Sequence, residues 1–325
     1  MGQFALDNIE RMFYSYFGIA IDETHNFFYI GQTVGGKKMN ILENTISPYE
    51  EMIAYETLWS QRDQSLKTLA DLFKHERALP SQILKRDLFN EDLQKKVSEF
   101  LKEKRGFSVS VHGDFQYPQK LRKAKYPVEL FYYRGDIGLL ERRSISIVGS
   151  RQCTEDGGKR TKKLVKEMVK HNFVIVSGLA SGIDTIALQT AIEEKGQVVG
   201  VIGTPIDNYY PPENAKLQDK IAKEYLLISQ VPFYRYATEP FTSRKNYFPQ
   251  RNETMSALSE ATIIVEASDT SGTLTQARAA IQQGKKLFIL NSCFENPDIK
   301  WPHTFAERGA IRVRDIKDIT SHLPS

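Results

Sequence analysis

The stretch SISIVGS (144–150), a helical run over about 158–171 and the stretch FVIVSG (173–178) together decide the fold predicted for this chain. Each quoted stretch is a short apolar run that ends in small residues, which is typical of a strand buried on both faces of a parallel sheet. The run between them is long enough to cross the sheet and return the chain parallel to the first strand. This part of the sequence therefore predicts a βαβ unit.

The same alternation continues toward the C-terminus. Further strands are expected at 197–203, 226–230, 261–267, 286–291 and 311–315. Further helices are expected at 182–194, 213–224, 251–259 and 271–283, with a long loop over 232–249. The pattern predicts an α/β fold, in which an extended Rossmann-like parallel sheet carries helices on both faces.

The first part of the chain follows another pattern. Ser47 and Pro48 suit the cap and first turn of a helix, and helical stripes follow at 66–73 and 91–104. We therefore expect a smaller, mainly helical N-terminal module over 1–105 and a Rossmann-like domain over 106–325.

The composition permits many functions and excludes a few. The 325 residues include 44 Lys and Arg against 40 Asp and Glu, a net charge of +4 that allows nucleic-acid binding without requiring it. No run of about 18 apolar residues and no secretory signal pattern is present. Cys153 and Cys293 are too far apart in sequence for a zinc pair. We expect a cytoplasmic protein with no membrane contact and no metal.

Small residues follow the predicted strands, at the edge where parallel sheets bind their ligands. Glycine lets backbone N–H groups approach a ligand closely, and helix N-termini favour anions. One such loop is only a tight turn, but several on one edge favour an extended phosphate-binding surface. Its candidate residues are Gly149, Ser150, Arg151, Ser177, Gly178, Gly182, Ser271, Gly272 and Thr273.

The stretch FTSRKNYFPQRN (241–252) interleaves cations with aromatic residues. Cations contact phosphates, and aromatic faces stack bases of any sequence, so the pattern favours single-stranded nucleic acid over a loop that merely packs on the sheet. Pro249 predicts an extended conformation for the residue before it. The candidate residues here are Arg244, Lys245, Phe248, Arg251 and Asn252.

Other patterns carry less weight. Lys159, Lys163, Lys166 and Lys170 recur at helical spacing, which favours a solvated helix face over a phosphate-binding ridge. Cys153 has no neighbouring base and is not expected to be a nucleophile. Neither GxGxxG nor GxxxxGK[ST] occurs, so we expect no nucleotide cofactor.

A series of short motifs resembles the DNA-processing protein A family (DprA/Smf). The motifs are DFQYPQKL (114–121), FYYRGD (131–136), SIVGSR (146–151), VSGLASGID (176–184), YYPPEN (209–214), FPQRN (248–252), VEASDTSGTLTQA (265–277) and GAIRV (309–313). The resemblance implies a Rossmann-like protein, usually dimeric, that binds single-stranded DNA and helps load a RecA-type recombinase during natural transformation. The resemblance implies that the residues by which the family contacts DNA correspond here to Arg151, Phe248, Arg251 and Asn252. It implies that the family's loops of small residues correspond to 177–182 and 271–273.

The sequence also departs from the family pattern. Leu188 stands where the family has His, Glu253 replaces the second Arg of an RNR element, Gln230 replaces Glu, and Ser181 stands at a position that is often basic. These departures indicate a divergent branch. They leave open a role as a regulator or antitoxin in a phage-defence or toxin system, with a toxin protein as partner.

An enzyme is the remaining alternative. The fold is similar to that of nucleotide phosphoribohydrolases of the lysine-decarboxylase-like group, whose motif is GGxGTxxE. In SGTLTQ (271–276), Gln276 stands where the catalytic Glu would be. Because an amide cannot act as that acid or base, we expect a DNA-binding protein without enzymatic activity.

Overall fold

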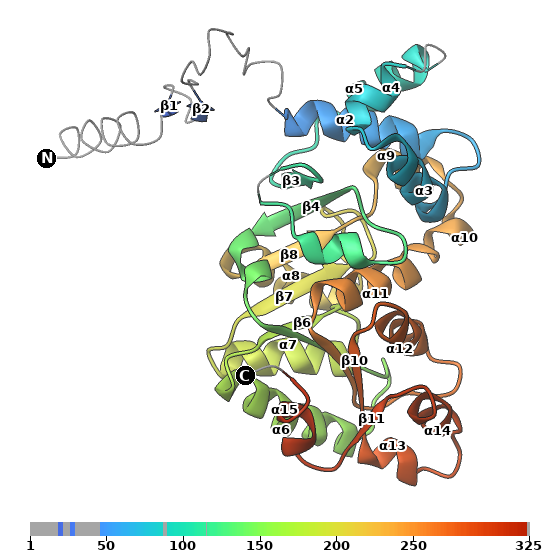
Figure 1. The fold of residues 1–325 in the computed structure, drawn as a ribbon. Coiled ribbons are helices and arrows are strands. Elements are labelled where there is room, and N and C mark those ends of the chain that lie inside the picture. Colours follow the sequence, from blue (N-terminus) through green and yellow to red (C-terminus); the bar gives the residue numbers. More distant parts are fainter. Residues whose placement is uncertain (1–18, 22–26, 30–45, 87–89, 115, 324–325) are drawn as a thin grey trace, which may run out of the picture. The chain divides into compact units, whose positions relative to one another are not determined.

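The computed structural model describes residues 19–21, 27–29, 46–86, 90–114 and 116–323 (Figure 1). The chain divides into two units, residues 1–47 and residues 48–325. In the first unit, β1 (Ile19–Ile21) and β2 (Phe27–Tyr29) pair as antiparallel strands. The second unit holds all the other described helices and strands.

Helices open the second unit, as the sequence predicts. Their bounds are α2 (Pro48–Ser60), α3 (Leu66–Glu76), α4 (Pro80–Leu84) and α5 (Glu91–Leu101). The start of α2 at Pro48 confirms the predicted helix start. Ser65 caps α3 through a hydrogen bond from the Thr68 amide, which satisfies one of the free N–H groups of the first turn.

A nine-stranded sheet has the order β11-β10-β9-β5-β6-β7-β8-β4-β3. Its strands are β3 (Ser108–Val111), β4 (Leu130–Gly135), β5 (Ser144–Val148), β6 (Val174–Ser177), β7 (Val198–Ile202), β8 (Leu226–Ser229), β9 (Ala261–Ile264), β10 (Lys286–Leu290) and β11 (Ile311–Val313). Strands β5 to β11 run parallel, which confirms the predicted fold class. Strands β3 and β4, for which no strand was predicted, add an antiparallel edge beside β8.

Helices cover both faces of the sheet (Figure 1). The long ones are α6 (Glu155–Lys170), α7 (Ile183–Glu193), α8 (Ala215–Glu224), α11 (Tyr247–Leu258) and α12 (Thr273–Gln282). The short ones are η2 (Gln119–Lys123), η3 (Ile137–Glu141), η4 (Pro212–Asn214), α9 (Phe233–Thr238), α10 (Phe241–Arg244), α13 (Asn291–Glu295), α14 (Trp301–Ala306) and α15 (Lys317–Thr320). Strands β6 to β8 lie on one side of β5 and β9 to β11 on the other, so the strand order reverses between β5 and β9.

The prediction of a long loop over 232–249 is wrong. This segment forms α9, α10 and the first residues of α11. Phe248 is therefore helical, and the extended conformation inferred from the following proline is wrong as well. Pro249 is tolerated because it lies in the first turn of α11, where its missing N–H would have no partner within the helix.

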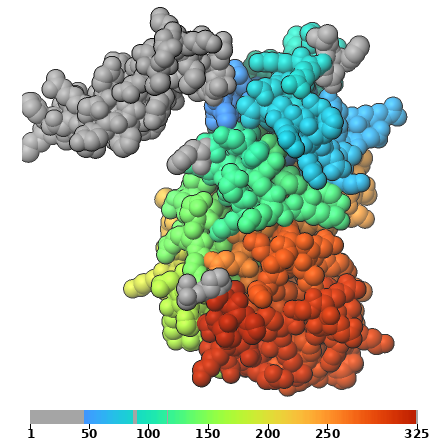
Figure 2. Space-filling view, in the orientation of Figure 1, coloured from blue at the N-terminus to red at the C-terminus, as the bar shows by residue number. Residues whose placement is uncertain are grey.

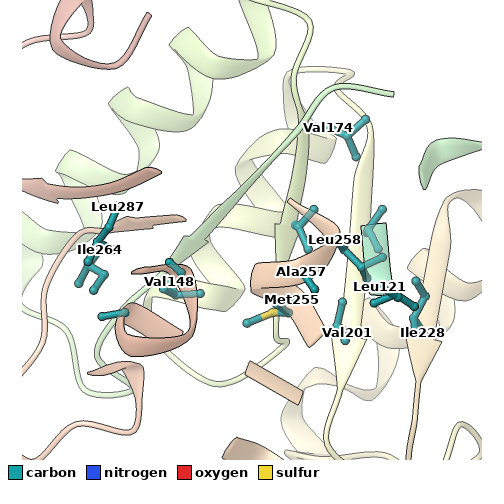
Figure 3. Close-up of a cluster of buried hydrophobic side chains, with 14 of the residues drawn as sticks. Leu121, Val148, Val174, Val201, Ile228, Met255, Ala257, Leu258, Ile264 and Leu287 are labelled. Carbon is teal, nitrogen blue, oxygen red and sulfur yellow. The ribbon is translucent and has the colours of Figure 1, made fainter. Parts of the chain in front are cut away.

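The core lies between the sheet and the helices, and Figure 3 shows part of it. Side chains from the strands, α11 and η2 meet there: Leu121, Val148, Val174, Val201, Ile228, Met255, Ala257, Leu258, Ile264 and Leu287. Burial of one such large aliphatic side chain contributes roughly 1.5–3 kcal/mol to folding. This packing fixes α11, and with it Phe248, against the sheet.

A buried carboxylate joins the N-terminal helices to the sheet edge. Glu56 of α2 accepts hydrogen bonds from the Phe233 amide at 2.7 Å, the Tyr234 amide at 3.0 Å and the hydroxyl of Tyr132. Helices α2 to α5 and the sheet thus form one compact unit, with the helices at one end of it (Figure 2). The domain boundary expected at residue 105 divides this unit and stays a prediction. In the part of the chain that the structure describes, no helix is long and apolar enough to cross a membrane.

Candidate functional site

A cleft of about 510 Å³ lies at the carboxyl ends of the strands where the strand order reverses. Open parallel sheets bind ligands at such a position, because the loops from the two neighbouring strands diverge there. We call it the switch-point cleft. The predicted site residues that line it are Gly149, Ser150, Arg151, Phe248, Arg251, Asn252, Ser271, Gly272 and Thr273.

The loop after β5 is held at both ends by Glu266. The Glu266 carbonyl accepts the Ser150 amide at 2.7 Å, and the Glu266 carboxylate accepts the Thr154 amide at 3.0 Å and the Thr154 hydroxyl at 2.7 Å. A side chain at Gly149 would lie 2.8 Å from the Glu266 carbonyl oxygen, so only glycine permits this approach. Arg151 projects from the loop between these two anchor points.

A cation and two aromatic rings stand together at the rim of the cleft, where it adjoins a smaller cleft that Tyr210 lines with Arg151 and Phe248. The Arg151 guanidinium lies 5.7 Å from the centre of the Phe248 ring, and the Tyr210 ring lies 5.3 Å from the same ring. Arg151 is exposed, and Tyr210 is 46% exposed. Phe248 packs on Gly203, where a side chain would come within 2.7 Å of the ring. The arrangement offers flat apolar surface beside an exposed positive charge.

Arg251 lies beneath the cleft instead of on its rim. Its side chain is buried, donates to the Val201 carbonyl at 3.1 Å and lies 3.8 Å from the Asp184 carboxylate. A side chain at Gly178 would occupy the same space as the guanidinium, so the glycine makes room for the arginine. Burial raises the pKa of Asp184 and lowers the pKa of Arg251, while their mutual attraction opposes both shifts.

The start of α12 is tied to the other walls of the cleft. Asn252 donates to the Gly272 carbonyl at 3.1 Å, and Thr273 donates to the Gly149 carbonyl at 3.1 Å. The Thr273 amide donates to the Ser271 hydroxyl at 3.2 Å. These polar side chains hold α11, α12 and the β5 loop in one arrangement.

Several predicted site residues lie elsewhere. The Ser177 hydroxyl is buried and donates to the Ile147 carbonyl at 2.7 Å, so it supports the sheet. Gly182, with φ +76°, packs behind the loop against the carbonyls of Ser150 and Arg151. Gly178 lines a smaller adjoining cleft with Arg151, Tyr210 and Phe248. Arg244 and Lys245 lie on α10 and the turn after it, outside the lining of the switch-point cleft.

Sequence reasoning missed Tyr210 and Glu266 as parts of the site. Both occur in the quoted family motifs, but no local pattern indicates that Tyr210 contacts Phe248 or that Glu266 contacts Thr154.

Gln276 does line the cleft and is fully buried, and its Oε1 has no hydrogen-bond partner within the described residues. Across those residues, no group of three or more His, Cys, Asp or Glu side chains could hold a metal ion.

Known proteins resemble this chain in sequence. Residues 108–324 match the family model for DNA recombination-mediator protein A. The chain is 37% identical over 210 residues to the DNA processing protein DprA of Bacillus subtilis, a match that covers 64% of this chain and 69% of that protein. It is 32% identical over 207 residues to the DNA processing protein DprA of Streptococcus pneumoniae, covering 64% of this chain and 71% of that protein.

Solved structures resemble it as well. The X-ray structure of DprA from Streptococcus pneumoniae matches with a TM-score of 0.65 and 27% identity, over 86% of this chain and 99% of that one. DprA from Helicobacter pylori, whose structure concerns a single-stranded DNA binding mode, matches with a TM-score of 0.57 and 28% identity, over 66% of this chain and 94% of that one.

Proposed function

This chain belongs to the DNA recombination-mediator protein A family, and from that membership we propose that it binds single-stranded DNA and acts without catalysing a reaction. The observation that carries the proposal is the group of Arg151, Phe248 and Tyr210 at the rim of the switch-point cleft. The Helicobacter pylori relative, whose structure concerns single-stranded DNA binding, supports the same ligand.

The chemistry of the rim suits an unpaired strand. The exposed Arg151 neutralises a phosphate, while Phe248 and Tyr210 offer ring surface to bases. Stacking requires bases that are free of a complementary strand, and it tolerates any sequence. Duplex DNA hides its base faces, so the site prefers single strands.

The lining of the cleft favours binding over hydrolysis. Asp184 is the one carboxylate among the described residues that line it, and this side chain is buried and paired with Arg251. Gln276 is an amide and cannot exchange a proton as a general acid or base does. Release of free base from nucleoside monophosphates by the purified protein would contradict this part of the proposal.

A finer part of the proposal concerns the partner. We infer that a homodimer in the cytoplasm delivers its bound strand to a RecA-type recombinase, as expected for a recombination mediator. Faster assembly of recombinase filaments on single-stranded DNA in the presence of this protein is the expected result. Tight binding of a toxin protein, with no effect on recombinase assembly, would favour the regulator or antitoxin alternative instead.

The DNA-binding proposal is tested by titrating a labelled oligonucleotide, single-stranded in one series and duplex in the other. We expect tighter binding of the single strand and a steep loss of affinity as salt rises, because each phosphate contact releases condensed counterions. Failure to bind single strands at low salt, by a protein shown to be folded, would refute it.

A further inference from the structure

The short helix α10 presents an aromatic ring to solvent. Phe241 is 81% exposed, whereas the other exposed large hydrophobic side chains among the described residues, Tyr49, Tyr209 and Tyr210, are between 44% and 46% exposed. An isolated exposed apolar residue is ordinary on a protein surface. This ring, however, has neighbours that suit a particular ligand.

Arg244 lies close to two aromatic rings. Its guanidinium carbon is 4.7 Å from the centre of the Tyr236 ring and 5.9 Å from the centre of the Phe241 ring. Tyr236 in turn lies 5.8 Å from Tyr247, a buried residue of α11. Arg244 thus lies close to one ring, Tyr236, that packs against the body of the protein and to another, Phe241, that is exposed to solvent.

Two cations of this segment lack an acidic partner in the part of the chain that the structure describes. Within the described residues neither Arg244 nor Lys245 has an ion-pair partner, and Glu239, in the same segment, pairs with Arg235 at 3.7 Å. The Arg244 Nε is buried and has no hydrogen-bond partner in the described part of the chain. Free cations beside an exposed ring complement a ligand that carries both anionic groups and flat apolar faces.

Helix α10 directly precedes, along the chain, the helix that contributes Phe248 to the switch-point cleft. Only Lys245 and Asn246 separate α10 from α11, and Phe248, the second residue of α11, lines the cleft. A strand that left the cleft past Phe248 and followed this segment would meet Lys245 and then α10. A flexible polyanion with unpaired bases can follow this route.

We propose that Phe241, Arg244 and Tyr236 form a second nucleotide subsite, in which Phe241 stacks a base of the bound single strand and Arg244 contacts its phosphate. The inference rests on the proposed function, since it extends the path of the same ligand. We call these three residues the α10 subsite. It predicts a binding site longer than the cleft itself.

The length of the oligonucleotide provides the first test. Phe241→Ala should weaken binding of a strand of about 20 nucleotides by about five-fold or more and leave a strand of about 5 nucleotides unaffected, because the short strand fills the cleft alone. Phe241→Leu keeps an apolar side chain without a flat π face and should behave like Phe241→Ala. Tyr49→Ala, which removes an exposed ring from α2, should change neither affinity.

A fluorescent reporter provides the second test. The native residues Trp59 and Trp301 are buried, so Phe241→Trp adds an exposed indole that can report on stacking. We expect the long strand to quench the new fluorescence and to retain its affinity, because an indole stacks as well as a phenyl ring. The short strand should leave this fluorescence unchanged.

The outcomes separate the two proposals. If the wild-type protein binds neither length, the proposed function fails. If both lengths bind and Phe241→Ala changes neither affinity, only the α10 subsite is refuted, and Phe241 is then free to contact a protein partner. If Phe241→Ala weakened binding of the long and the short strand equally, the subsite would also be refuted, because the Phe241 ring would then act within the cleft.

Discussion

The guanidinium of Arg251 lies 3.8 Å from the carboxylate of Asp184, and both side chains are buried beneath the switch-point cleft. Asp184 also accepts the Gly178 amide at 3.2 Å, so the ion pair connects α11 to the loop after β6. The sequence suggested Arg251 as a phosphate contact. The structure gives it a second role, as the support on which the cleft is built.

Arg251→Ala should destabilise the fold by about 3–5 kcal/mol, because it leaves the Asp184 carboxylate buried without its partner. Urea unfolding followed by circular dichroism measures the change. Adding Asp184→Asn to this variant should recover part of the lost stability, since no charge then remains buried alone. A stable Arg251→Ala variant would show that the pair does not support the cleft.

Arg151→Ala should weaken binding of single-stranded DNA about tenfold and lower the salt slope by about one, as expected for the loss of one phosphate contact. Because Arg151 is exposed, unfolding in urea should be unchanged. Arg308→Ala removes an equal charge from the exposed turn after α14 and serves as the matched control. Equal affinities of the two variants would argue against Arg151 as a DNA contact.

Glu266→Gln should weaken DNA binding even though it removes a negative charge near the proposed path of a polyanion. The reason is that Glu266 anchors the loop that carries Arg151, through its two hydrogen bonds from Thr154. Glu155→Gln makes the same charge change at an exposed position of α6 and should bind slightly more tightly or the same.

A double-mutant cycle decides what Glu266 does. In the Arg151→Ala background, Glu266→Gln should have little further effect on affinity, because there is no arginine left to position. Tighter binding by the single Glu266→Gln variant would mean that this carboxylate only repels DNA.

Stability should fall as the pH rises from about 4.5 to about 7. Burial raises the pKa of Glu56 to about 7, with Tyr132, the two backbone amides and Lys104 opposing the shift. A raised carboxyl pKa means that folding favours the protonated form, so this contribution to stability is complete below the unfolded pKa and is lost as Glu56 ionises. Its size is of the order of a few kcal/mol.

Unfolding free energies of the wild type and Glu56→Gln, measured across this pH range, test the prediction. The glutamine variant should be less stable at low pH, because its side-chain NH2 group would face the backbone N–H of Tyr234 and two donors cannot pair. Its stability should depend less on pH, because the glutamine side chain does not ionise. An equal slope in both proteins would assign the pH dependence to other groups.

Much of the fold follows from local patterns. The strand of residues 144–148 is apolar throughout and is flanked by small residues, so its type and approximate bounds are readable from the chain itself. Residues 130–135 were missed because strand β4 is specified by its antiparallel pairing with β8, far along the chain. The helices within 232–249 were missed because Pro240 and Pro249 suggest a loop, although both residues stand at helix starts.

The sequence by itself determined the chemistry of the site. Loops of small residues follow the parallel strands, an arginine lies in the first of these loops, and a later segment mixes aromatic and basic residues. Tertiary structure alone decided which of these side chains meet solvent. Arg151 and Arg251 are both arginines in quoted motifs, yet one is exposed and the other is buried against Asp184. Burial depends on packing between α11, β7 and the β6 loop, which are distant in sequence, and no local pattern encodes that contact.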